Sequence, residues 1–213
     1  MSETLTAVLL IILGWLFGLL TPIITNHNLR ARENKEVLLA LQVELSELKY
    51  RLACAVYRVN MHNGTVDRHL LEWLKPIFEN YTGINPFEKI RDSINMQLKL
   101  PDEQIKALSD YDKADSSGGL TLKKYNVPLL ETKFALISAF RTPLQNQLIE
   151  LRTNLNMLNE EVDQARYYFN LTFDSNLSEN NHAIVNTNLD NTYEKHSIMA
   201  MKIVNQINSI KWT

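Results

Sequence analysis

The sequence is poor in cysteine, glycine and proline. Its 213 residues include 1 cysteine, 6 glycines and 6 prolines. A single cysteine, Cys54, excludes an intramolecular disulfide and a zinc site built from several cysteines. Scarce glycine and proline argue against a turn-rich β architecture and a collagen-like chain, because both need these residues often. A helical fold is compatible with this low content of cysteine, glycine and proline.

The chain also lacks an excess of charge of either sign. It has 22 Lys and Arg against 24 Asp and Glu, a formal net charge of -2. This balance argues against a strongly basic nucleic-acid binder, so no nucleic-acid partner is expected. With 45% hydrophobic residues the chain is too apolar to be disordered.

Catalytic signatures are missing as well. The chain has no Walker A loop, GxGxxG, GxSxG or HExxH motif. Zinc could bind to His62, Asp67 and His69 if a turn brought them together. The better interpretation is that Asp67 caps a helix and that the two histidines are solvated. We expect a protein that is not an enzyme and has no cofactor or metal; the sequence leaves a small-molecule ligand open.

One long hydrophobic run is present near the N-terminus. Residues Ala7 to Thr25 carry no charge, and at ~1.5 Å per residue they match a hydrocarbon core of ~30 Å. A cleaved signal peptide would have a basic start and a shorter run, whereas only Glu3 is charged before this one. The sequence predicts a retained transmembrane helix over about 6–25, within an anchor segment 1–28.

The flanks of this run predict its orientation. No Lys or Arg precedes it, whereas Arg30, Arg32 and Lys35 follow it. The positive-inside rule then places the N-terminus outside and the C-terminal part in the cytoplasm, with the three basic residues against anionic lipid head groups. We expect a single-pass protein of a bacterial inner membrane, with the lipid bilayer as its partner.

Two glycines inside the run form a GxxxG motif. Gly14 and Gly18 lie on one side of the predicted helix. Small residues at this spacing let two helix backbones approach closely in lipid. The motif predicts a contact between two membrane helices at these positions.

Residues 29–213 are expected to form an all-α cytoplasmic bundle. After a polar hinge at 26–28, the segment 29–62 contains neither glycine nor proline, which favours one long helix. Its apolar residues alternate in steps of three and four, as in a coiled-coil seam. The seam consists of Leu38, Leu41, Leu45, Leu48, Leu52, Ala55 and Val59. The seam fits a homo-oligomer, a helical protein partner or a helical hairpin within one chain. In a parallel coiled coil, Glu44 and Lys49 could pair between the two helices.

Turn and cap residues divide the rest of the bundle into helices. Gly64 is expected to end the first long helix in a left-handed conformation, and Asp67 to cap the next one. The stretch 112–120 is predicted to be a flexible loop. Pro143 is expected to restart a helix of about thirty residues, and a last helix follows the polar loop 174–181.

Three smaller features complete the sequence. Cys54 is expected to be a packed, unreactive thiol, and His196 a hydrogen-bonded core or interface histidine. Lys123, Lys124 and Tyr125 place bases beside an aromatic ring, as nucleotide sites often do. The preferred interpretation of this cluster is a solvated helix face.

Three functional hypotheses follow. The first is a membrane-anchored helical scaffold, adaptor or regulator that acts through self-association or partner binding. The alternative is a membrane-perturbing effector of the bacterial immunity or toxin type, whose bundle senses a signal and clusters the transmembrane helices. An enzyme or small-ligand binder with a pocket in the bundle is the third.

Overall fold

The computed structural model describes residues 3–83, 87–115 and 119–212, and within them the chain is all-helical. This confirms the all-α class. The helices are α1 (Glu3–Asn63), α2 (Arg68–Glu79), α3 (Glu88–Gln97), α4 (Asp102–Asp115), α5 (Pro128–Thr132), α6 (Phe134–Ile137), α7 (Thr142–Leu171) and α8 (Glu179–Ser209).

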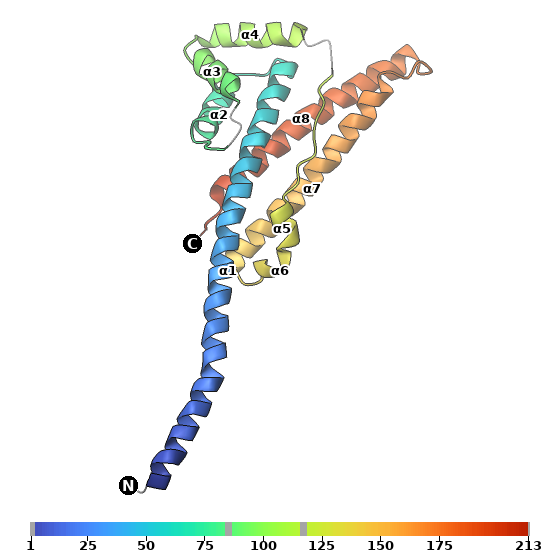
Figure 1. The fold of residues 1–213 in the computed structure, drawn as a ribbon. Coiled ribbons are helices and arrows are strands. Elements are labelled where there is room, and N and C mark those ends of the chain that lie inside the picture. The colour runs from blue at the N-terminus through green and yellow to red at the C-terminus, as the bar shows by residue number, and fades with distance from the viewer. Residues whose placement is uncertain (1–2, 84–86, 116–118, 213) are drawn as a thin grey trace.

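α1 is one continuous helix of 61 residues, about 90 Å long at ~1.5 Å per residue. The hinge expected at 26–28 is wrong, because those residues are helical. No glycine or proline stands there to break the helix, and Pro22 lies inside it without ending it. In Figure 1 the N-terminal part of α1 projects far beyond the other helices, so only its C-terminal half belongs to the bundle.

The bundle is built around the C-terminal half of α1. α7 and α8 form an antiparallel hairpin, and α8 packs across α1 (Figure 1). α2, α3 and α4 lie on another side of the same half of α1, where the Trp73 indole N–H donates to Asn205 Oδ1 at 2.9 Å and joins α2 to α8. Every helix therefore meets α1 or α8 directly or through a neighbour.

The leucine seam of α1 lies in the core of its own chain. Leu41, Leu45, Leu48, Leu52 and Val59 are buried, and Leu38 and Ala55 are partly buried. The intramolecular alternative therefore accounts for their spacing.

The two charged residues beside the seam are also used within the chain. The Glu44 carboxylate accepts from the backbone N–H groups of Leu129 and Leu130, at 2.8 and 3.1 Å, at the start of α5. Lys49 Nζ donates to Asn208 Oδ1 of α8 at 3.2 Å. Within one chain each of the two residues thus has another partner, and their pairing between two chains stays a prediction.

Several predicted helix boundaries are confirmed. Gly64 has a φ of 65° directly after α1, the left-handed conformation that glycine adopts at low cost. Asp67 Oδ1 accepts from the Leu70 N–H at 2.7 Å and caps α2, and α7 restarts at Thr142 beside Pro143. The loop predicted at 112–120 is wrong in part, since α4 continues to Asp115. Residues 116–118 lie outside the described residues.

An extended segment, residues 119–127, joins α4 to α5 and runs along the bundle (Figure 1). Its backbone is fixed by side chains of the α7–α8 hairpin. Asn159 both accepts from the Tyr125 N–H, at 2.9 Å, and donates to the Tyr125 carbonyl, at 2.8 Å. The Tyr193 hydroxyl donates to the Leu120 carbonyl at 2.8 Å. One edge of the segment is thus held by the hairpin, and the segment lies between the hairpin and α1.

Candidate functional site

The N-terminal third of α1 exposes an apolar surface on all sides. The described side chains between Ala7 and Thr25 are all exposed, with Ile11 at 72% and Trp15 at 67%. This helix is long and apolar enough to cross a membrane. A soluble chain would leave this surface in water at a cost of roughly 25 cal/mol per Å² of apolar area.

The polar groups on this surface are few, and one of them is satisfied within the helix. The Thr21 hydroxyl donates to the Phe17 carbonyl at 2.6 Å, so it needs no partner outside the helix. A Cβ added to Gly14 or Gly18 would meet nothing within 4 Å. The two predicted contact positions therefore face open space in the single chain.

A mostly exposed stretch of α1 separates the apolar surface from the core. Buried residues begin at Val37, so about eleven helical residues, ~16 Å, lie between Thr25 and the bundle. The three basic residues of the predicted membrane surface, Arg30, Arg32 and Lys35, are exposed on this stretch. Arg32 Nε also pairs with Glu36 Oε1 at 2.9 Å, one turn further on.

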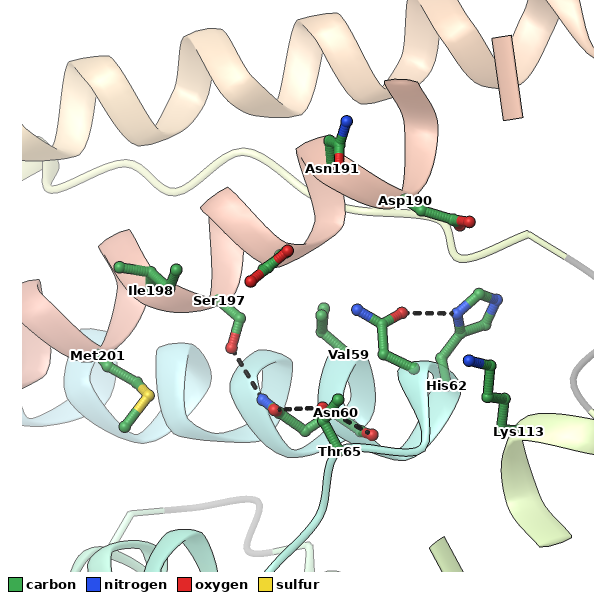
Figure 2. A pocket seen from close by; sticks show the side chains of 12 residues that line it. Val59, Asn60, His62, Thr65, Lys113, Asp190, Asn191, Ser197, Ile198 and Met201 are labelled. Carbon is green, nitrogen blue, oxygen red and sulfur yellow. Dashed lines mark hydrogen bonds between the residues drawn. The ribbon is translucent and has the colours of Figure 1, made fainter. Parts of the chain in front are cut away.

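A polar pocket of about 560 Å³ lies between the end of α1, α8 and α4 (Figure 2). Asn60 Nδ2 donates to Ser197 Oγ at 2.8 Å across it, and Thr65 Oγ1 donates to Asn60 Oδ1 at 2.7 Å. Lys113 brings a positive charge to the wall, and Asp190 and Glu194 bring negative ones. The wall therefore carries charges of both signs, with one more negative than positive side chain.

The zinc alternative raised by the sequence is not assembled. His62 lines this pocket, whereas Asp67 and His69 line a different one beside α4. Among the described residues no group of three His, Cys, Asp or Glu side chains is placed to hold a metal ion. The expected role of Asp67 as a cap of α2 is the one its hydrogen bond shows.

His196 is the most unusual titratable group of the bundle. Its ring is completely buried on α8, 6.2 Å from the Tyr125 ring between centroids. Neither ring nitrogen has a hydrogen-bond partner within the described chain, so the hydrogen-bonded histidine expected from sequence is wrong in that respect. Burial lowers the pKa of His196 to about 4, which keeps the ring neutral at physiological pH.

Cys54 is buried on α1, as expected from its place beside the seam. Burial raises the pKa of its thiol to about 12. Since the thiolate is the reactive form, this thiol is unsuited to nucleophilic chemistry.

Comparison of the chain with protein-family models, curated proteins and solved structures finds no match.

Proposed function

We propose that the protein is a single-pass membrane protein in which the N-terminal third of α1 spans the bilayer. The observation that carries the proposal is the complete exposure of an apolar surface long enough to cross it. A core helix of a soluble protein would be mostly buried. A cleaved signal sequence would not continue without a break into the central helix of the folded bundle, as this helix does.

The bundle is then a helical scaffold, adaptor or regulator held in the cytoplasm just off the membrane. The absence of glycine between residues 26 and 36 favours a stiff connection, so the bundle and the membrane helix move as one body. Arg30 lies about 7 Å beyond Thr25 and Lys35 about 15 Å. The first distance is within a Debye length of ~8 Å at physiological salt, so Arg30 is placed to meet anionic head groups, whereas Lys35 is largely screened from the end of the apolar run.

Extraction of cell membranes at alkaline pH tests this function. The wild-type chain is expected to stay in the membrane pellet. Leu13→Arg with Leu16→Arg is expected to move it to the soluble fraction, because each arginine near the centre of a membrane helix costs about 3 kcal/mol.

A matched control uses the same helix outside the apolar run. Leu29 and Leu39 are also exposed leucines of α1, and Leu29→Arg with Leu39→Arg should leave the chain in the pellet. A wild-type chain that is soluble at alkaline pH, or one that both double variants release equally, contradicts the proposal.

The open positions at Gly14 and Gly18 favour a second candidate, the membrane-perturbing effector. In this form a second copy of α1 packs against the two glycines and clustered membrane helices disturb the bilayer. Gly14→Ile with Gly18→Ile is expected to abolish any loss of membrane potential on expression, and Leu16→Ile with Leu20→Ile on the opposite side to preserve it. A dye that reports membrane potential distinguishes the two, and an intact potential in cells that express the wild type excludes the effector.

A further inference from the structure

A second pocket, of about 200 Å³, lies between α1 and the extended segment 119–127. α1 contributes Arg51 and Arg58, two turns apart, to its wall, and the extended segment contributes Lys123 and Tyr125. Phe87, at the start of α3, lines it as well. Three parts of the chain distant in sequence thus bring three cations and two aromatic rings to one hollow.

The charge of this pocket is of one sign. Among the residues that the structure describes, no aspartate or glutamate lines it. Six other basic residues of the described chain pair with a carboxylate, namely Arg32, Arg68, Lys75, Arg91, Lys106 and Lys124. Arg51, Arg58 and Lys123 form no such pair within the part of the chain that the structure describes. The chain as a whole has a net charge of -2, so the positive charge of this pocket is a local feature.

The rest of the wall is apolar and partly preorganised. The Arg51 guanidinium lies 5.5 Å from the centroid of the Tyr125 ring, close enough for a cation–π contact that restrains it. Tyr125 and Val59 are buried, whereas Phe87 is 55% exposed and presents its ring at the rim. The pocket offers cationic hydrogen-bond donors beside apolar surface. At about 200 Å³ it is smaller than a typical pocket for a whole organic ligand, so it suits an anionic group inside and a planar group against the exposed Phe87 ring.

We propose that this pocket binds a small phosphorylated ligand of the nucleotide class. The guanidinium groups of Arg51 and Arg58 donate to its phosphate oxygens, with Lys123 as a further charge, and its ring lies against Phe87. Guanidinium groups suit this task because their donors match two phosphate oxygens at once. This accounts for the base and aromatic cluster at Lys123 to Tyr125, which sequence alone placed on a solvated helix face.

A lipid head group would supply the same phosphate chemistry, but its distance argues against it. Arg51 is about 26 residues beyond Thr25 along an unbroken helix, or ~39 Å from the end of the apolar run. The choice of a soluble ligand over a lipid rests on the membrane helix proposed above. The anion site itself does not rest on the membrane helix. Ligand binding can therefore fail while the membrane extraction result stands, and membrane extraction can contradict the anchor while ligand binding is observed.

Isothermal titration calorimetry of the full chain in detergent tests the site with AMP, ATP, pyrophosphate and adenosine as probes. We expect saturable binding of the phosphorylated probes and at least tenfold weaker binding of adenosine. Arg58→Gln should weaken ATP binding about tenfold, as loss of a charge-assisted hydrogen bond does. Arg141→Gln, which removes an exposed arginine outside the pocket, should leave it unchanged.

Three outcomes would overturn the proposal. The first is no binding of any phosphorylated probe at 1 mM, and the second is equal loss of affinity in Arg58→Gln and Arg141→Gln. The third is tighter binding of vesicles with anionic phospholipid, or of single-stranded RNA, than of ATP at the same site, measured by competition. Because Arg58 is exposed, Arg58→Gln is expected to keep the helix content of the wild type, which circular dichroism checks.

Discussion

Replacing Leu45 by aspartate is expected to unfold the bundle and not to release monomers from an oligomer. Leu45 is 0% exposed, at the centre of the face that α1 turns toward its own chain. Truncation of a buried leucine alone costs about 2–5 kcal/mol, and an unpaired buried charge adds to that. The sum approaches the total stability of a domain, roughly 5–15 kcal/mol.

Helix content and particle mass separate the two outcomes. Circular dichroism at 222 nm should show a large loss of helix for Leu45→Asp, and Val43→Asp should behave as wild type, because Val43 is 71% exposed on the same helix. Unchanged helix content together with a smaller detergent-solubilised particle would mean instead that Leu45 holds two chains together.

Acidification is expected to destabilise the folded chain through His196. The pKa of this group is about 4 in the folded chain, against 6.5 for a histidine in water, so the unfolded chain binds the proton more readily. Stability is therefore fully present above pH 6.5 and is lost as the pH falls toward 4. The shift corresponds to about 3 kcal/mol, at ~1.4 kcal/mol per pH unit.

His196→Leu isolates this contribution. The variant replaces a ring without hydrogen-bond partners by an apolar side chain. The difference in unfolding free energy between variant and wild type should therefore grow in favour of the variant as the pH falls from 7 to 4.5. Urea melts at several pH values measure this difference. His182→Leu on the same helix leaves the buried ring in place, so it is the control, and a difference for His196→Leu that does not change with pH contradicts the account.

The helical plan of the chain could be predicted from sequence because its determinants are local. The spacing of the leucines of α1 places Leu41, Leu45 and Leu48 on one face, and the burial of that face agrees. Gly64 and Asp67 likewise act on their immediate neighbours, as a left-handed residue and a cap. The hinge expected at 26–28 does not form, because asparagine and histidine weaken a helix only slightly.

The segment that covers each apolar helix face could not be predicted, because it depends on contacts between residues distant in sequence. A heptad pattern is the same whether a second chain or α8 covers it. The pairing of Glu44 with the start of α5 joins residues about 85 positions apart, and nothing near Glu44 signals it. The basic pocket is a similar case. Lys123 and Tyr125 are close together in sequence, but Arg51 and Arg58 join them only through the course of the extended segment.

The topology of α1 is the central claim, and labelling of single cysteines in intact bacterial cells tests it most directly. In a Cys54→Ala background, a cysteine replaces either Glu3, before the apolar run, or Asn156, exposed on α7. A membrane-impermeant maleimide is expected to label Glu3→Cys in intact cells and Asn156→Cys only after the membrane is opened. Labelling of Asn156→Cys in intact cells, or of both positions to the same extent, would contradict a bundle held in the cytoplasm by a spanning α1.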